Sequence, residues 1–278
     1  MVLDDVVLQV EGQSLSAQAE DLALHDQTRN KTLSVRVSYP LCDGYFPVII
    51  FSHGAGGSKD TYSYLSQFWC QRGYVVIQPS HYDSISVLRE QRPRRSFLQL
   101  MKSMPSDPNG WIDRTNDVSF LIDSLGELPE LLPGLIGKID SSSIGVGGHS
   151  YGAFTAQLIA GVRPPSPFSI AEIEKPLSDS RVKAILAMSA QGVRSSSSAF
   201  GFDDMESFAE LRLPALYVTG DRDVSIWNDV RHRLQGFSGG AKGDKYAIVI
   251  DGANPVSYTH LRAHETKANI VCRLLLEK

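Results

Sequence analysis

The feature that most constrains the fold is the stretch 144–154, which reads Ile-Gly-Val-Gly-Gly-His-Ser-Tyr-Gly-Ala-Phe. An apolar run leads into it, and a small, apolar run compatible with a helix follows to Ala160. Glycines on either side of Ser150 allow a strand and a helix to approach without Cβ clashes. The stretch therefore predicts a strand, a sharp turn and a helix, with the Ser150 hydroxyl projecting above a sheet. The alternative is a glycine-rich turn with no further role.

Apolar runs alternate with segments compatible with helices along most of the chain. Such continuous runs are typical of strands buried on both faces of a parallel sheet. We expect a hairpin over 21–39, helices over 63–72 and 111–128, and strands at 46–51, 74–78, 139–146, 182–188, 213–219 and 245–250. The alternation predicts an α/β fold with a mostly parallel central sheet and helices on both faces.

Two segments interrupt this alternation. Residues 84–110 contain a basic run and then a turn-rich stretch, and residues 163–176 are rich in proline. We expect both to be excursions over the sheet edge, where specificity elements tend to lie. A solvated helix face is the alternative for the basic run.

The length of 278 residues fits one large α/β domain, which we place at 1–254, with 1–20 as a loose arm or a first strand. The net charge of −4 gives no footprint for nucleic acid. Three cysteines without a CxxC motif argue against a disulfide framework or a structural zinc, so we expect no metal and no cofactor. No apolar run is long enough to span a membrane.

The N-terminus lacks a cationic region followed by an apolar one, so we expect no signal peptide and a cytoplasmic protein. Met1 is not necessarily the native start. The sequence carries no indication of the oligomeric state.

A serine hydroxyl needs a base to take its proton and donors to stabilise an oxyanion before it can act as a nucleophile. Residues 53–57 read His-Gly-Ala-Gly-Gly and follow an early strand, where this layout places one donor. We expect the donors to be the backbone N–H groups of Ala55 and Tyr151, the residue after Ser150. The alternative is a glycine turn with His53 packed in the core.

The acid should follow a later strand, and both Asp221 and Asp223 do so. We favour Asp223, because a strand, a glycine, two residues and then the acid is the commoner layout. Asp221 is then a turn or capping residue. In the order serine, acid, histidine, the base should follow the strand at 245–250.

The family resemblance rests on four stretches. They are 46–57 (Phe-Pro-Val-Ile-Ile-Phe-Ser-His-Gly-Ala-Gly-Gly), 73–81 (Gly-Tyr-Val-Val-Ile-Gln-Pro-Ser-His), 144–153 and 213–223 (Leu-Pro-Ala-Leu-Tyr-Val-Thr-Gly-Asp-Arg-Asp). With these the chain resembles, over about residues 21–254, the α/β-hydrolases of the predicted dienelactone hydrolase group, close to the platelet-activating-factor acetylhydrolase branch.

The resemblance implies a serine hydrolase that cleaves small carboxylic esters through an acyl-enzyme intermediate. Dienelactone hydrolases proper use cysteine, so Ser150 favours the serine esterase side. Residues 251–254 resemble the segment just before the family's histidine, and where that histidine is expected this chain has Pro255. A hydrolase-fold binding protein without catalysis and a small peptidase of the same fold are the alternatives.

The tail has an unusual sequence. Residues 255–266 read Pro-Val-Ser-Tyr-Thr-His-Leu-Arg-Ala-His-Glu-Thr, which resembles the frame translation of a common tagmentation sequencing adapter. The match continues through the flow-cell arm to Lys278, with Ile270 as the departure. We expect 255–278 to be a non-native tail. A genuine amphipathic helix over 268–276 is the alternative.

The adapter would leave only the first base of codon 255 native. Proline requires that base to be C, which histidine codons share, so we expect a catalytic histidine at 255 in the parent protein. This chain should then be impaired, unless His260 in the tail substitutes. The other histidines are weaker candidates for the base: His25, His81, His149, His232 and His264.

Overall fold

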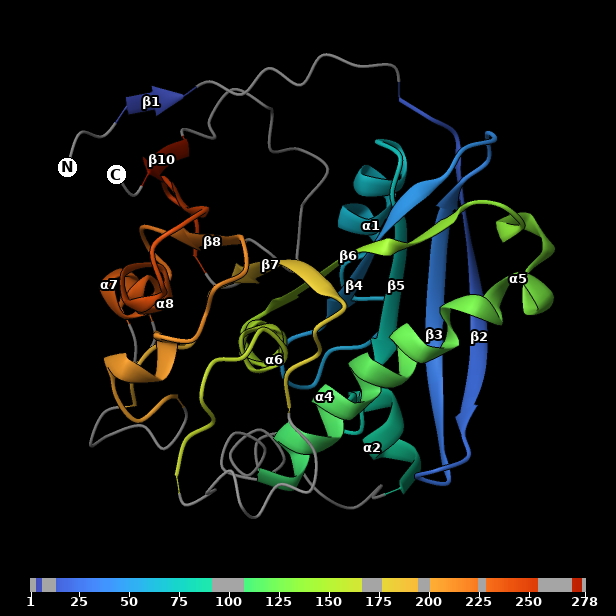
Figure 1. The fold of residues 1–278 in the computed structure, drawn as a ribbon, viewed down its shortest axis with the longest axis horizontal. Coiled ribbons are helices and arrows are strands. Elements are labelled where there is room, and N and C mark those ends of the chain that lie inside the picture. The colour runs from blue at the N-terminus through green and yellow to red at the C-terminus, as the bar shows by residue number, and fades with distance from the viewer. Residues whose placement is uncertain are drawn as a thin grey trace.

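The computed structural model describes residues 4–6, 14–91, 108–166, 177–194, 201–224, 229–254 and 272–276. Its centre is a 10-stranded sheet with the order β1-β10-β9-β8-β7-β6-β4-β5-β3-β2 (Figure 1). The strands are β1 (Asp4–Val6), β2 (Ala17–Asp26), β3 (Lys31–Pro40), β4 (Phe46–Ser52), β5 (Val75–Ser80), β6 (Ile139–His149), β7 (Val182–Met188), β8 (Ala215–Gly220), β9 (Lys245–Ile250) and β10 (Cys272–Leu276).

The middle of the sheet is parallel, and both edges are antiparallel. Strands β5, β4, β6, β7, β8 and β9 pair in parallel. The β2–β3 hairpin joins β5 antiparallel at one edge, and β10 and β1 join β9 at the other. The predicted α/β fold with a mostly parallel sheet is confirmed.

The sheet decides between alternatives that the sequence left open at the two ends of the chain. Residues 17–20 are not a loose arm but the first part of β2, paired with β3. The alternative of a helix over 268–276 is wrong for residues 272–276, which pair with β9 as a strand.

The helices lie on both faces of the sheet, as predicted. They are α1 (Ser63–Cys70), α2 (Ile85–Gln91), α4 (Pro108–Asp123), α5 (Leu128–Leu131), α6 (Tyr151–Ile159), α7 (Val230–Arg233) and α8 (Gln235–Gly239). Helices α4 and α6 pack on one face, and α1 on the other. Within the described part of the chain, no helix has the length and apolar character of a membrane span.

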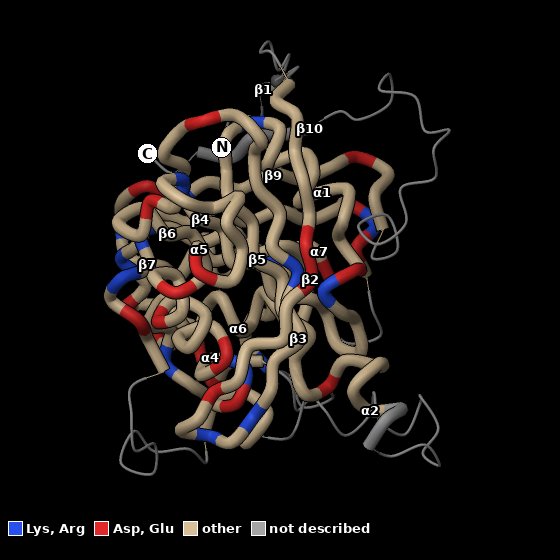
Figure 2. Tube along the Cα trace, turned by 90° about the vertical axis from the view of Figure 1, so that its right-hand side faces the viewer, with Lys and Arg blue, Asp and Glu red and all other residues tan. Residues whose placement is uncertain are grey.

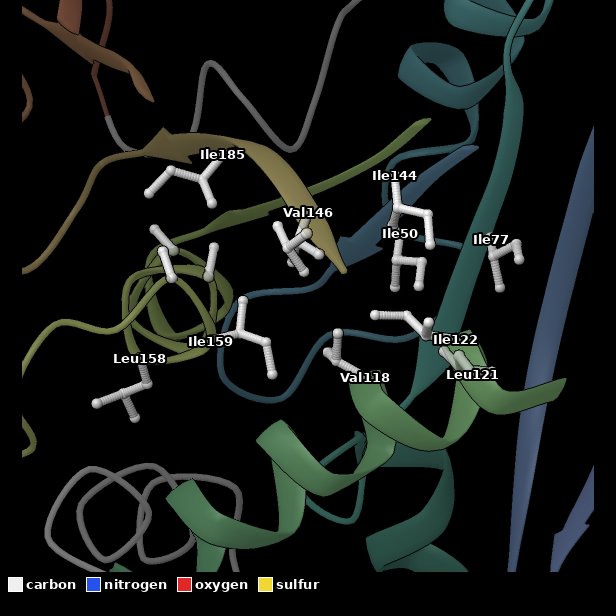
Figure 3. Close-up of a cluster of buried hydrophobic side chains, with 14 of the residues drawn as sticks. Ile50, Ile77, Val118, Leu121, Ile122, Ile144, Val146, Leu158, Ile159 and Ile185 are labelled. Atoms are coloured by element: carbon white, nitrogen blue, oxygen red, sulfur yellow. The ribbon is translucent and has the colours of Figure 1, made fainter. Parts of the chain in front are cut away.

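Side chains that point alternately to the two faces of the central strands form a hydrophobic cluster on each side of the sheet. Ile50 of β4 and Val146 of β6 face Val118 and Ile122 of α4 in Figure 3. The next residue after Ile50, Phe51, points to the opposite face and packs in a second cluster with Tyr62 and Met188. Successive strand residues point to opposite faces, so continuous apolar runs are what a sheet covered on both sides requires.

The turn of the β2–β3 hairpin is held against α4 by ion pairs. Lys31 Nζ lies 2.7 Å from Asp117 Oδ1 and 2.5 Å from Asp113 Oδ2, and Arg29 Nη1 lies 2.8 Å from Asp117 Oδ1. Figure 2 shows these basic and acidic segments next to each other. The ion pairs fix α4 relative to the edge of the sheet.

Because β4, β6, β8 and β9 run parallel, the residues that follow them emerge at the same edge. The loops after Ser52, His149, Gly220 and Ile250 therefore meet there. Ligands of open α/β sheets bind at this carboxyl edge.

Candidate active site

Ser150 lies on the turn between β6 and α6 with φ 53° and ψ −110°. A positive φ is strained for a residue with a Cβ and persists only where the surroundings impose it. Here the Ser150 N–H donates to the Met188 carbonyl at 2.9 Å, and the Ser150 carbonyl accepts from the Phe154 N–H at 3.1 Å. Ser150 is partly exposed, whereas His149 and Tyr151 on either side are buried. The turn thus presents the serine and hides its neighbours.

The glycines around Ser150 are required by contacts between backbones. A Cβ atom on Gly148 would collide with the Gly152 carbonyl group, and one on Gly152 would collide with the carbonyl group of Ser52. Strand β6, helix α6 and strand β4 therefore meet at distances that only glycine permits. The glycine pattern of the sequence is explained by this three-way packing.

The loop 53–57 passes directly beside Ser150. A Cβ atom built on Gly54 would lie 3.7 Å from Ser150 Cβ and 3.1 Å from His149 Nδ1. Ala55, one of the two residues predicted to donate to an oxyanion, follows Gly54 and is half-buried. Tyr151, the other, is the first residue of α6, and the first N–H groups of a helix point out of its N-terminal end. The structure thus places both predicted donor residues next to Ser150.

His53 is a buried part of this loop. Its Nε2 accepts from the His81 N–H at 3.0 Å, so Nδ1 carries the proton and donates to the Gly54 carbonyl at 2.6 Å. Burial and the nearby Arg114 lower the pKa of His53 to about 4. His53 is therefore neutral at pH 7 and fixes the backbone of the loop.

A buried ion pair underlies the loop. Arg114 of α4 donates from Nε to Asp83 Oδ1 at 2.9 Å and from Nη2 to Asp83 Oδ2 at 2.8 Å. Both side chains are fully buried. Burial alone would raise the pKa of Asp83, but Arg114 lowers it to about 2. This pair was not predicted from the sequence, although Arg114 lies three residues after buried Trp111 and four before buried Val118, on the apolar face of its helix.

The two candidate acids have different surroundings. Asp223 is fully buried, and its Oδ2 accepts from Thr219 Oγ1 at 3.0 Å, while Arg233 Nη2 lies 3.4 Å from Oδ1. Asp221 is exposed, and its Oδ1 accepts from the Gly252 N–H at 2.7 Å. Asp223 thus faces inward beneath the carboxyl edge, and Asp221 caps the turn of the neighbouring loop. Arg233 was not anticipated from the sequence.

The segment after β9 packs on the loop that carries Asp221 and Asp223. The Arg222 N–H donates to the Ala253 carbonyl at 3.1 Å, and a Cβ atom on Gly220 would collide with that carbonyl. The chain leaves Asn254 beside the loop that carries Asp223. Position 255, where the sequence analysis expects the native base, lies outside the described residues, as do His260 and His264.

The described histidines have other surroundings. His81 is buried between Asp117 Oδ2, 2.8 Å from its Nδ1, and Ser52 Oγ, 3.1 Å from its Nε2. The ring of His149 lies 5.7 Å from that of Tyr62, and burial lowers the pKa of His149 to about 4.

His25 bonds to Thr32 Oγ1, and His232 bonds to the Val193 carbonyl. Within the described residues there is no cluster of three or more histidine, cysteine or acidic side chains that could hold a metal ion.

A mostly parallel sheet that carries a serine on a strained strand-to-helix turn defines the α/β-hydrolase fold. Residues 13–95 match the family of platelet-activating factor acetylhydrolase, isoform II. The predicted resemblance to α/β-hydrolases of this group is confirmed. No curated protein matches the chain.

Solved structures show the same fold. The crystal structure of a candidate dienelactone hydrolase from Klebsiella pneumoniae subsp. pneumoniae MGH 78578 matches with a TM-score of 0.60 and 16% identity, covering 91% of this chain and 93% of that chain. A cold-adapted esterase from an Arctic intertidal metagenomic library matches with a TM-score of 0.59 and 15% identity, covering 90% and 92%. At these identities the comparison establishes the fold.

Proposed function

We propose that the protein is by descent a serine hydrolase that cleaves small carboxylic esters, with Ser150 as the nucleophile. The observation that carries the proposal is the strained, partly exposed Ser150 on the β6–α6 turn with the glycine loop 53–57 beside it. The matching acetylhydrolase family and the structural similarity to an esterase support ester cleavage.

In the first step, Ser150 Oγ attacks the ester carbonyl carbon while a histidine takes the hydroxyl proton. The carbonyl oxygen becomes an oxyanion, which the N–H groups of Ala55 and Tyr151 stabilise. When the carbon–oxygen bond to the leaving group breaks, the imidazolium returns its proton to the departing alkoxide. The acyl group stays on Ser150, and water releases it as a carboxylic acid by the same steps. Asp223 orients the histidine.

We further propose that the hydrolase domain comprises residues 1–254 and that 255–278 is a non-native tail. The chain then lacks the histidine that belongs at 255. Without this base, only the residual catalysis from the oxyanion donors and from substrate binding remains. The proposed reaction requires neither metal nor cofactor, and the partner of the protein is a small ester substrate.

The test is acylation of Ser150 by an activated short-chain ester or a fluorophosphonate, followed by intact mass and peptide mapping. We expect slow labelling of Ser150 in this chain and none in Ser150→Ala. Labelling that persists in Ser150→Ala, or that maps elsewhere, would refute the assignment. A folded protein that never labels would favour the binding-protein alternative, and faster acylation by activated peptides than by esters would favour the peptidase.

A further inference from the structure

The Arg114 side chain contacts both segments that border Ser150. Its Nη1 donates to the His53 carbonyl at 2.8 Å, at the start of the loop that carries Ala55. Its guanidinium also lies over the Tyr151 ring, with Cζ 4.1 Å from the ring centroid. Helix α4, which carries Arg114, is separate in sequence from both segments. One buried side chain therefore bridges two backbone elements of the site.

Asp83 extends the bridge to the far side of Ala55. While Arg114 holds its carboxylate through two hydrogen bonds, Asp83 Oδ2 also accepts from the Gly56 N–H at 3.2 Å. The carbonyl two residues before Ala55 and the N–H one residue after it are therefore tied to the same ion pair. The backbone N–H of Ala55 lies between these two fixed points.

We propose that Arg114, held by Asp83, is a positioning residue that sets the N–H groups of Ala55 and Tyr151 at the spacing required to bind an oxyanion. The inference rests on the proposed function, because it assigns the ion pair a role in the reaction of Ser150. Arg114 does not touch the substrate. It acts through the His53 carbonyl and the Tyr151 ring.

The geometry explains why arginine occupies this position. A buried ion pair gives little net stability compared with well-packed apolar side chains. A guanidinium is planar, however, and its two bonds to Asp83 fix the orientation of that plane. The same plane then stacks on Tyr151 and directs Nη1 at the His53 carbonyl. A lysine keeps the charge but has no planar fork. It therefore cannot contact the Tyr151 ring and the His53 carbonyl while it is held by Asp83.

The experiment compares Arg114→Lys with Lys138→Met. Lys138 is a matched control because it is also a buried cation, and its Nζ donates to the carbonyls of Pro40 and Leu41, away from Ser150. Acylation of Ser150 by p-nitrophenyl acetate gives a saturating rate constant and a half-saturating concentration. Hydrogen exchange of the 53–57 peptide and near-ultraviolet circular dichroism follow the loop and the fold.

We expect Arg114→Lys to lower the saturating rate constant by up to about a hundred-fold, the loss that a misplacement of about 1 Å can cause, and less than the roughly hundred- to thousand-fold loss when a donor is removed outright. The half-saturating concentration should change little, and the loop peptide should exchange faster. Lys138→Met should lower the thermal midpoint while the acylation constants and the loop exchange stay unchanged. If Arg114→Lys does not fold, Asp83→Asn should show the same pattern with a smaller loss.

Unchanged acylation and unchanged loop exchange in folded Arg114→Lys would overturn the proposal. So would equal losses in the Lys138→Met control. If the unmutated chain does not acylate at Ser150, the proposed function fails, but hydrogen exchange of the loop 53–57 still decides whether Arg114 holds that loop.

Discussion

Thr219 Oγ1 donates a 3.0 Å hydrogen bond to Asp223 Oδ2 at the carboxyl end of β8. This bond anchors one carboxylate oxygen, and the other lies 3.4 Å from Arg233 Nη2. In the proposed mechanism Asp223 orients the base, so Asp223→Asn in a Pro255→His variant should lower turnover by about four orders of magnitude. Asp221→Asn is the control, because Asp221 is exposed and only accepts from the Gly252 N–H. Steady-state ester hydrolysis measures both variants, and the reverse ranking would identify Asp221 as the acid.

Replacement of Pro255 should restore the base. After β9 the chain reaches Asn254 beside the loop that carries Asp223. The order serine, acid, histidine requires an imidazole at this point of the chain. Pro255→His, followed by a C-terminal segment from a relative, should raise esterase turnover by orders of magnitude, as measured with a chromogenic ester. Strong activity in the present chain that His260→Ala abolishes would instead mean that the tail supplies the base.

The contact between Gly148 and Gly152 predicts a structural effect that does not depend on catalysis. Gly148→Ala would force the Cβ atom into the Gly152 carbonyl, so we expect a loss of about 1–3 kcal/mol in the free energy of unfolding. Gly126→Ala is the matched control, because Gly126 is exposed and a Cβ there meets nothing within 4 Å. Urea denaturation compares the two. Equal stabilities would mean that β6 and α6 are further apart than described.

The buried histidines predict instability in acid. The pKa of His53 and that of His149 are both lowered to about 4 by burial, from 6.5. Arg114 further lowers the pKa of His53, while Asp83 and Asp117 partly oppose this; at His149, Asp223 opposes and Arg233 adds to the lowering. Below pH 6.5 the unfolded chain binds protons that the folded one does not. The free energy of unfolding should therefore fall between pH 6.5 and 4, by about 1.4 kcal/mol per pH unit for each histidine.

Asp83 continues this trend at lower pH. Its pKa is lowered from 3.8 to about 2, so its contribution to stability is lost as the pH falls from 3.8 to 2. Urea titrations at a series of pH values test both ranges. A free energy of unfolding that stays constant from pH 7 to 4.5 would show that the two histidines are protonated in the folded state as readily as in the unfolded one.

Truncation after Asn254 tests the tail. If residues 255–278 are the non-native tail proposed above, removing them should leave the thermal stability nearly unchanged. The truncation also removes strand β10, because residues 272–276 pair with β9. It therefore tests directly whether this pairing stabilises the fold. Thermal unfolding of the truncated and full chains decides. A loss of several kcal/mol, comparable with a deleted core element, would show that β10 is an integral strand.

The parts of the fold that were predicted are those in which one segment determines its own structure. Strands β7 and β9 have the expected boundaries, because a buried parallel strand is an uninterrupted apolar run. Helices α7 and α8 were missed, because they are short and α8 contains Gly236 and Gly239. Their placement depends on packing beside β8, which no local pattern reveals.

In the candidate site, too, the residues that were predicted are those that a local sequence pattern identifies. Ser150 and its glycines form one contiguous motif, and Asp223 follows a recognisable strand. Asp83 and Arg114 are 31 positions apart in sequence and meet only after α4 has packed on the sheet. A charged residue on the apolar face of a helix is a visible anomaly, but its partner cannot be identified without the fold.

The sheet order also has a consequence for the growing polypeptide on the ribosome. Strand β6 pairs with β4, so the loop 53–57 and the turn at Ser150 can come together once the first 160 or so residues have emerged, because domains begin to fold from the N-terminal side. Asp223 follows two strands later, and the segment that ends at Asn254 comes last. Under the proposed function, Ser150 and the loop 53–57 therefore come together on a nascent chain well before Asp223 is synthesised, so a nascent hydrolase with this strand order stays inactive until β8 and the segment after β9 have also emerged.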